Sequence, residues 1–222
     1  MFDLSIISPI GVLEVLGTFA FAISGIRLAA QKKMIDWFGA FVIGLVTATG
    51  GGTTRDLLLG VRPFWLEDPT YLATTGVALV VALLFQDRLF RRDRTMFLFD
   101  AIGLGLFTIA GLTKSLALGL PVWTSILMGT ITGSVGGVIR DVLINEVPLL
   151  FRKDIYALAC VLGGVVYVIV GSLSVSEPIV QGIAVAVVIL TRFVAVRYHL
   201  QLPTLILRDG DGPSDDAGSR PA

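Results

Sequence analysis

The sequence has few of the side chains on which most enzymes and metal sites depend. It contains one cysteine, Cys160, and one histidine, His199. A single cysteine cannot form an internal disulfide, and the two residues together are too few for a cysteine- or histidine-ligated metal cluster. A nucleophile activated by histidine has no candidate inside the apolar segments, because His199 follows the last of them. We therefore expect no catalytic residues, no resident metal and no enzyme activity.

Charged residues are also scarce. They make up 15% of the 222 residues, against roughly 25% in a typical soluble domain, whereas 55% of the residues are hydrophobic and the mean hydropathy is +0.86. The formal net charge is zero, so no overall field favours nucleic acid. This composition predicts an all-α integral membrane protein whose surroundings are membrane lipids, with no nucleic-acid partner and no cofactor.

Apolar segments long enough to cross a membrane recur along the chain. A hydrocarbon core of about 30 Å needs roughly 20 residues of helix. Seven segments qualify, near residues 9–30, 35–60, 70–87, 97–116, 122–146, 155–173 and 178–197. Proline starts or stops helices, and it falls at or near the segment ends, at Pro63, Pro69, Pro121, Pro148 and Pro178. We predict seven transmembrane helices.

Lysine and arginine concentrate in alternate loops, and short loops rich in these residues usually face the cytoplasm. The basic residues lie in the loops that follow the first, third, fifth and seventh segments or in the adjoining segment ends; they are Arg27, Lys32, Lys33, Arg88, Arg91, Arg92, Arg94, Arg152, Lys153, Arg197 and Arg208. We expect a multi-pass protein of the inner (plasma) membrane with its N-terminus outside and its C-terminus in the cytoplasm. The tail at 201–222 is rich in Gly, Asp, Ser and Pro, which predicts disorder.

The chain contains an internal repeat, marked by a glycine motif inside an apolar segment. Residues 50–56 read Gly-Gly-Gly-Thr-Thr-Arg-Asp, and residues 136–141 repeat the pattern 85 positions later as Gly-Gly-Val-Ile-Arg-Asp. Further matches at this offset, or one residue more, include Glu14/Asp100, Gly17/Gly103, Phe21/Phe107, Gly25/Gly111, Gly44/Gly129, Thr47/Thr132, Leu58/Leu143, Pro63/Pro148 and Tyr71/Tyr156.

The repeat covers three predicted spans. An odd number of spans forces the second copy to enter the membrane from the opposite side, so the two copies should be inverted. We therefore divide the chain into a first three-helix repeat at 1–95, a second, inverted repeat at 96–175, a seventh helix at 176–200 and a disordered cytoplasmic tail at 201–222.

The glycine motifs are the candidate functional site. Each glycine disfavours a helix by about 1 kcal/mol relative to alanine, so we predict that the second and fifth spans break there. Broken helices in inverted repeats often form binding sites near the membrane midplane, and carbonyl and hydroxyl oxygens suit transient K⁺ or Na⁺. The candidate pore or cation-binding residues are Thr49, Gly50, Gly51, Gly52, Thr53, Ser134, Gly136 and Gly137. The alternative is that the glycines only allow close helix packing.

Charged side chains inside apolar segments normally face the bundle interior and need partners. Neighbours such as Arg55 and Asp56 do not face each other on a helix, so each needs another partner. Glu14 lies at about the depth of Arg55, and its repeat mate Asp100 lies near Arg140. We predict two equivalent pairs, Glu14 with Arg55 and Asp100 with Arg140.

The remaining charges have simpler interpretations. Asp56 and Asp141 stay available to bond backbone amides or to meet ions. The charged residues of both motifs either gate a pathway or only brace the helices, and the sequence favours neither. Lys114 and Arg62 lie near segment ends, where long cationic side chains usually extend to the membrane interface.

Two inverted three-span units with a Gly-Gly-x-x-Arg-Asp motif in each second span, followed by a lone seventh span, resemble the trimeric intracellular cation channel (TRIC) family, in its prokaryotic branch. The likeness covers about residues 9–198 and departs at Val135, where a third glycine would align. The resemblance implies a homotrimer with one pore per protomer that conducts monovalent cations, chiefly potassium. The alternative function is a secondary transporter of glycine or another small solute.

Overall fold

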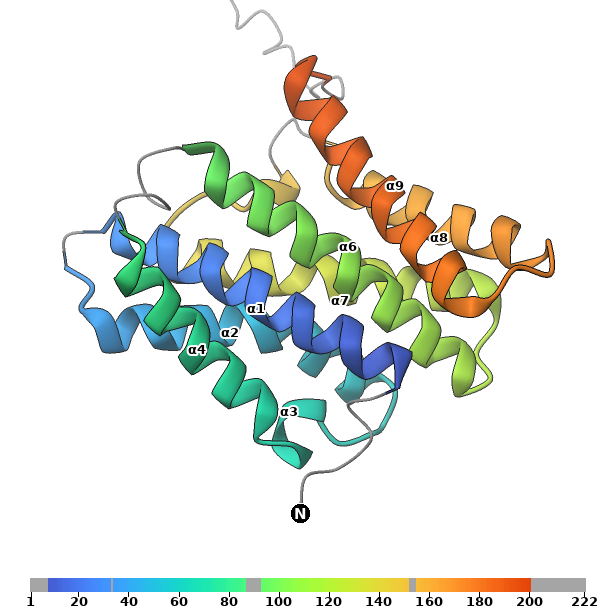
Figure 1. Ribbon diagram of the computed structural model, residues 1–222, viewed down its shortest axis with the longest axis horizontal. Helices are drawn as coiled ribbons and strands as arrows, with labels where there is room; N and C mark the ends of the chain where they lie inside the picture. The colour runs from blue at the N-terminus through green and yellow to red at the C-terminus, as the bar shows by residue number, and fades with distance from the viewer. Residues whose placement is uncertain (1–7, 33, 87–92, 152–154, 201–222) are drawn as a thin grey trace, which may run out of the picture.

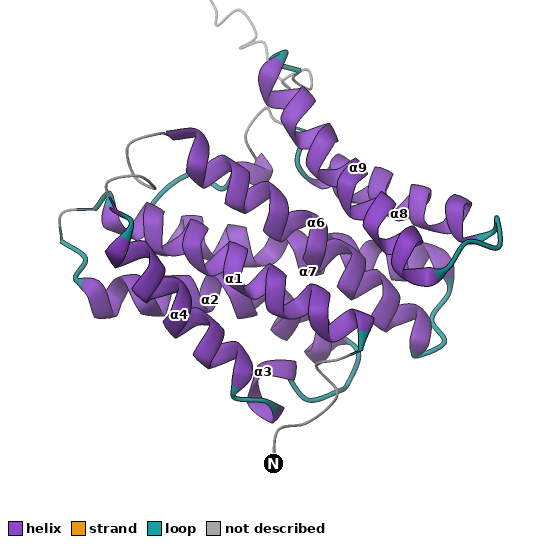
Figure 2. Cartoon of the chain, viewed as in Figure 1, coloured by secondary structure: helices purple, strands orange, loops and turns teal. Residues whose placement is uncertain are grey.

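The computed structural model describes residues 8–32, 34–86, 93–151 and 155–200 (Figure 1). Figure 2 shows that these residues form helices and loops, with no β-strand among them. The long helices are α1 (Pro9–Ala30), α2 (Trp37–Leu58), α4 (Thr70–Leu84), α6 (Asp93–Ala117), α7 (Val122–Leu143), α8 (Ala157–Gly171) and α9 (Glu177–Arg197). A short helix, α3 (Phe64–Glu67), and a 3-10 turn, η2 (Leu149–Phe151), lie in the connections. The predicted all-α class is confirmed, and each predicted segment contains a helix.

Local sequence signals explain where the helices begin and end. The side chains of Ser8 and Asp36 accept hydrogen bonds from the first-turn N–H groups of α1 and α2, at 3.0 and 2.7 Å. After α2 and α6 the chain turns through Gly60 and Gly119, whose positive φ angles of 70° and 80° suit glycine. Prolines stand at the starts of later helices, as predicted: Pro63, Pro69 and Pro121 precede α3, α4 and α7, and Pro178 is in the first turn of α9.

Several helices are suited to a membrane. Four stretches are long and apolar enough to cross one by length and composition: Pro9–Ala30, Thr95–Ala117, Val122–Leu143 and Glu177–Arg197. The apolar helices α4 and α8 have 15 residues each, which at 1.5 Å per residue span about 22 Å, less than a full hydrocarbon core of about 30 Å. Large apolar side chains on the outer faces are exposed, including Leu84 of α4, Ile169 of α8 and Leu190 of α9. These features are those of a multi-pass membrane protein.

Four helices form the centre of the bundle. α1 packs on α2 and α6, and α7 packs on the same two helices from the other side (Figure 1). α4 covers α1 and α2, while α8 covers α7 and α6. Where α1 meets α6, the rings of Phe21 and Phe107 stack with their centroids 5.5 Å apart. The remaining helix, α9, lies against α6 and α8 at one edge.

Some predictions concern parts of the chain outside the described residues. These are the disordered tail at 201–222 and the basic loop residues Lys33, Arg88, Arg91, Arg92, Arg152, Lys153 and Arg208.

Candidate functional site

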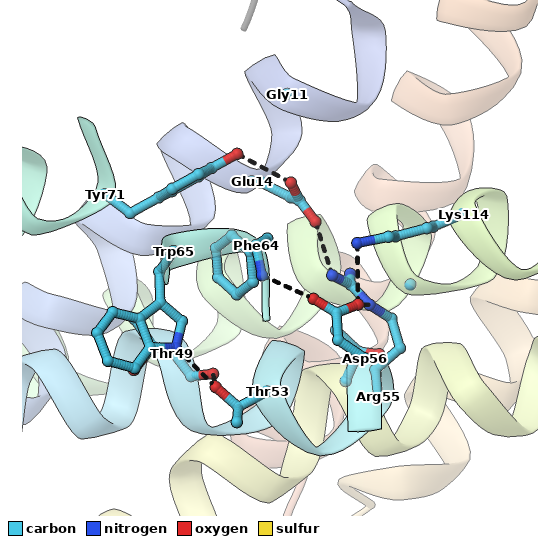
Figure 3. A network of polar contacts seen from close by, with 12 residues as sticks. Gly11, Glu14, Thr49, Thr53, Arg55, Asp56, Phe64, Trp65, Tyr71 and Lys114 are labelled. Carbon is cyan, nitrogen blue, oxygen red and sulfur yellow. Dashed lines mark hydrogen bonds and ion pairs between the residues drawn. The ribbon is translucent and has the colours of Figure 1, made fainter. Parts of the chain in front are cut away.

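Five side chains from four helices form a polar cluster, here called the α2 cluster: Glu14, Arg55, Asp56, Tyr71 and Lys114 (Figure 3). Arg55 Nη2 lies 2.9 Å from Glu14 Oε1, and Arg55 Nε donates to Asp56 Oδ1 at 2.7 Å. Lys114 Nζ, near the end of α6, lies 2.9 Å from the same Asp56 oxygen. Tyr71 of α4 donates its hydroxyl to Glu14 Oε2 at 3.0 Å. The cluster therefore ties α1, α2, α4 and α6 together.

Charge balance makes this cluster tolerable in an apolar bundle. Two carboxylates face two cations, and the side chains of Arg55 and Asp56 are completely buried. Buried charges are stable only when they are paired and hydrogen-bonded. Asp56 gains a further donor because its Oδ2 accepts from the Phe64 N–H at 2.9 Å. That bond also shapes the turn after α2 and places the Phe64 ring 5.6 Å from the Arg55 guanidinium.

A second set, the α7 cluster, consists of Ser24, Asp100, Arg140 and Asp141. Arg140 Nη1 donates to Asp100 Oδ1 at 2.6 Å and to Ser24 Oγ at 2.8 Å. Arg140 Nε donates to Asp141 Oδ1 at 2.9 Å, and Asp141 Oδ2 accepts from the Leu149 N–H at 2.9 Å. The α7 cluster joins α1, α6 and α7 in the way that the α2 cluster joins α1, α2 and α6.

The two clusters share one pattern of contacts. In each, an arginine near the end of a helix bonds the aspartate that follows it, and that aspartate accepts the N–H of the residue eight positions later. In each, the arginine also pairs with an acid on an earlier helix. They differ at the tyrosines: Tyr71 bonds Glu14, whereas the hydroxyl of its repeat mate Tyr156 has no hydrogen-bond partner among the described residues.

The clusters lie at different heights in the bundle. Along α1, Ser24 follows Glu14 by ten residues, about 15 Å at 1.5 Å per residue. Along α6 the order is reversed, because Asp100 of the α7 cluster precedes Lys114 of the α2 cluster. α1 and α6 therefore run antiparallel, and each contributes to both clusters.

Both predicted ion pairs, Glu14 with Arg55 and Asp100 with Arg140, are present. The prediction that an arginine could not contact the aspartate next to it was wrong in both clusters. The directions of neighbouring Cβ atoms do diverge on a helix, but an arginine side chain is long enough to fold back toward its neighbour. Asp56 and Asp141 both bond backbone amides, as predicted.

Glycines lie where α2 and α7 cross. A Cβ added to Gly51 would overlap the carbonyl oxygen of Thr132, and a Cβ added to Gly136 would overlap that of Thr47. These contacts are with backbone atoms, so neither helix can yield by moving a side chain. Small residues permit this close approach of helices in membranes.

The glycines next to this crossing contact side chains rather than a facing carbonyl. A Cβ at Gly50 would lie 3.0 Å from Ile139 Cδ1, and one at Gly137 would lie 3.0 Å from the Tyr156 hydroxyl. A Cβ at Gly52 would overlap the Phe64 ring.

The predicted breaks at Gly50–Gly52 and Gly136–Gly137 are absent. α2 runs as one helix from Trp37 to Leu58, and α7 does so from Val122 to Leu143. The prediction of broken helices was wrong because tertiary packing outweighs the weak intrinsic preference of glycine. A break would leave carbonyl oxygens free to bind a cation, but α2 is unbroken and the Gly50 carbonyl also accepts a bond from Thr54 Oγ1 at 2.9 Å.

Hydroxyl groups of the predicted site are bonded within their own helices. Thr49, Thr53 and Ser134 donate to the carbonyl four residues earlier, at 2.8, 2.8 and 2.6 Å. Such bonds satisfy hydroxyl hydrogens in an apolar setting. Thr53 Oγ1 also accepts from Trp65 Nε1 at 2.9 Å (Figure 3). A hydroxyl oxygen has two acceptor lone pairs, so these groups keep some capacity to meet a cation.

Two functional candidates were missed in the sequence. Lys114 was assigned to the membrane interface, but it reaches back to Asp56, and its side chain is only 25% exposed. Arg192 of α9 was not considered, although its burial is nearly complete. An arginine inside an apolar segment indicates a buried charge that needs a partner. The repeat comparison that pointed to Arg55 and Arg140 offers no counterpart for Arg192, because α9 has no repeat mate. No group of His, Cys, Asp or Glu that could hold a metal occurs in the described ranges.

Comparison with known proteins gives consistent matches. A family model described as "Glycine transporter" matches residues 11–87 and again 97–172. The chain is 42% identical over 200 residues to the UPF0126 inner membrane protein YadS of Escherichia coli (strain K12), covering 88% of this chain and 95% of the relative. It is 39% identical over 201 residues to a UPF0126 membrane protein of Vibrio cholerae serotype O1, covering 88% of this chain and 82% of the relative.

Solved structures of similar shape are cation channels. A TRIC trimeric intracellular cation channel orthologue from Rhodobacter sphaeroides superposes with a TM-score of 0.79 at 33% identity, covering 85% of this chain and 97% of that one. A structure described for conductance through TRIC cation channels gives 0.76 at 34% identity, with 89% and 97% covered. A prokaryotic TRIC channel in 0.5 M KCl gives 0.78 at 30% identity, with 87% and 98% covered. These similar structures are described as channels and not as enzymes.

Proposed function

This chain belongs to the trimeric intracellular cation channel (TRIC) family, and we propose that it is a potassium-conducting channel, a homotrimer in which each protomer has its own pathway. One observation carries the proposal: two buried clusters of paired charges lie at different heights of a bundle whose solved relatives are cation channels. A membrane protein that only braced its helices would gain little from ionised groups, because charges within the bilayer are expensive.

The proposed architecture is seven transmembrane helices, arranged as two inverted three-helix repeats and a seventh helix, α9. The antiparallel course of α1 and α6 supports the inversion, because these helices hold the repeat mates Glu14 and Asp100. The two successive matches of one family model, which begin 86 residues apart, support the same division. The basic loops support an external N-terminus and a cytoplasmic C-terminus. A reporter fused to the C-terminus should be active in the cytoplasm; activity outside would reverse this orientation.

In this proposal the ion pathway runs beside the crossing of α2 and α7, not through it. The backbones touch at Gly51 and Gly136, which leaves no room between them. The hydroxyls of Thr49, Thr53 and Ser134 each lie two residues from one of these glycines and offer oxygen ligands for transient K⁺ or Na⁺. The two charge clusters then act at the two ends of the pathway.

Single-channel recording tests the proposed function. Purified protein in a planar bilayer with unequal KCl concentrations on the two sides should give unitary currents that reverse near the equilibrium potential of K⁺. Protein-free bilayers and bilayers with the same detergent serve as controls. The mass of the purified complex, measured by native mass spectrometry, should equal three chains. The absence of unitary currents from a correctly assembled complex would reject the channel.

A second candidate function follows from the name of the matching family model, "Glycine transporter". A carrier would exchange glycine across proteoliposomes with saturable counterflow and without unitary currents. The two functions are therefore separated by measuring glycine counterflow and current on the same preparation.

Lys114 should limit cation entry at the α2 cluster. Its ammonium lies 2.9 Å from Asp56 and occupies the place that a permeant cation would take beside that carboxylate. Replacing Lys114 with methionine keeps most of the apolar stem and removes the charge, so the local potential becomes more negative and attracts cations. We expect a severalfold increase in K⁺ current and a higher K⁺ to Cl⁻ permeability ratio, measured from reversal potentials.

The matched control for this prediction is Arg62→Met. Arg62 is exposed and lies beyond the end of α2, so its removal should leave the current almost unchanged. If the two substitutions changed the K⁺ current equally, both effects would come from the general surface potential. Lys114 would then have no specific role in the ion pathway.

A further inference from the structure

Arg192 is a buried cation on the helix that has no repeat mate. It lies on α9 with only 1% of its surface exposed. Its Nη1 donates to the Ile155 carbonyl at 3.0 Å, just before α8. Its guanidinium carbon lies 4.7 Å from the centre of the Tyr156 ring and 5.3 Å from that of Phe97. Among the described residues, no carboxylate lies within ion-pair distance of it. The interactions of its guanidinium among the described residues are therefore with two aromatic rings and one carbonyl.

Tyr156 connects Arg192 to the α7 cluster. It is the residue before the first turn of α8, and its hydroxyl lies 3.0 Å from the position that a Cβ of Gly137 would occupy. Gly137 is three residues before Arg140 on α7, so it occupies the same helix face, one turn away. The Tyr156 ring is thus held between α9 and the part of α7 that bears the cluster.

The corresponding tyrosine in the first repeat is held differently. Tyr71 is fixed by a hydrogen bond from its hydroxyl to Glu14. The repeat mate of Glu14 is Asp100, which is shorter by one methylene group, and the Tyr156 hydroxyl is left without a partner among the described residues. The Tyr156 ring is instead held by the Arg192 guanidinium, which lies against its face.

We propose that Arg192 is a positioning residue, which holds Tyr156 against the α7 cluster and so couples α9 to the opening of the pathway. The proposal rests on the proposed channel function. The planar guanidinium is needed because it stacks on aromatic rings while donating in its own plane to a carbonyl, which the ammonium of lysine cannot do in the same geometry. Movement of α9 relative to α6 and α8 would then release the Tyr156 ring and change the surroundings of Arg140.

The first test compares Arg192→Gln with Arg197→Gln, which removes an exposed arginine from the next turns of the same helix. We expect Arg192→Gln to change the open probability severalfold at an unchanged unitary conductance, and Arg197→Gln to change neither. Arg192→Lys should resemble Arg192→Gln, because the charge alone does not restore the stack. Wild-type open probability in Arg192→Gln, or full rescue by lysine, would overturn the proposal.

The second test asks whether Arg192 acts on the α7 cluster through Tyr156. Tyr156→Phe keeps the ring and should preserve the effect of Arg192, whereas Tyr156→Leu removes the ring. The double variant Arg192→Gln/Tyr156→Leu should gate no differently from Tyr156→Leu alone. Additive effects on open probability would show that the two residues act separately, which contradicts the proposal. If Arg192→Gln fails to assemble, comparison of Tyr156→Leu with Tyr156→Phe in the wild-type background still tests the role of the ring.

Hydrogen exchange separates this proposal from the channel function. Measured by mass spectrometry on the purified complex, exchange at the start of α8 and the end of α7 should be severalfold faster in Arg192→Gln than in Arg197→Gln. This result does not require that the protein conduct ions, so a protein without current can still show the coupling. Unchanged exchange in these segments would overturn the positioning role even if the protein is a channel.

Discussion

Replacement of Arg55 with alanine should destabilise the folded protein by about 3–5 kcal/mol, the usual effect of removing one partner from a buried ion pair. The Arg55 side chain is fully buried between Glu14 and Asp56. Without it, Asp56 keeps Lys114, whereas Glu14 keeps, among the described residues, the hydroxyl of Tyr71. The effect should appear as a lower unfolding temperature in detergent, measured by size-exclusion chromatography of protein heated to increasing temperatures.

The same cluster provides an internal check. Glu14→Gln should destabilise less than Arg55→Ala, because Arg55 keeps its bond to Asp56. Adding Glu14→Gln to Arg55→Ala should recover part of the loss, since the stranded carboxylate is then neutral. Asp100→Asn with Arg140→Ala should follow the same pattern in the α7 cluster. A double-mutant cycle without coupling at either pair would falsify the energetic role of these contacts.

Gly51→Ala should be the most damaging glycine-to-alanine change among the described residues. The new Cβ would overlap the carbonyl oxygen of Thr132, a backbone atom that cannot rotate away. α2 and α7 would have to separate, and overpacking of this kind typically costs about 1–3 kcal/mol. We expect a lower unfolding temperature and a loss of current together, and Gly51→Leu should prevent assembly.

Two other glycines are matched controls. Nothing lies within 4 Å of a Cβ added at Gly76 of α4 or Gly182 of α9. Alanine at either position should therefore be neutral or slightly stabilising, because alanine favours a helix by about 1 kcal/mol relative to glycine. If Gly51→Ala is as well tolerated as Gly182→Ala, the two helices do not touch in the membrane and the crossing is open.

The charges were predictable because the physics of burial leaves few choices. An ionised group inside an apolar helix must have a partner, and the internal repeat points to Glu14 for Arg55 and to Asp100 for Arg140. The additional contact of each arginine with the aspartate next to it was not predicted. Lys114 was not predictable in the same way. Its position near the end of α6 fits both a side chain that extends to the interface and one that turns inward, and only the packing of α6 beside the end of α2 brings it to Asp56.

The glycines illustrate the opposite case. Helix propensity predicts a break at Gly50–Gly52, and that prediction failed because propensity describes an isolated helix. In the bundle, the absence of a side chain at Gly51 and Gly136 lets two backbones meet, and the packing stabilises the helices that glycine alone would weaken. The glycines therefore stabilise the contact between α2 and α7 instead of breaking either helix.

The sequence by itself determined the membrane class, the helix positions, the repeat and the two arginine–acid pairs, because each follows from composition, from periodicity or from the requirement that a buried charge be neutralised. Only the tertiary structure decided that the glycines form a crossing, that Lys114 completes the α2 cluster and that Arg192 stacks on Tyr156. These contacts join residues far apart in the chain. They depend on the distances between whole helices, which no local pattern of residues encodes.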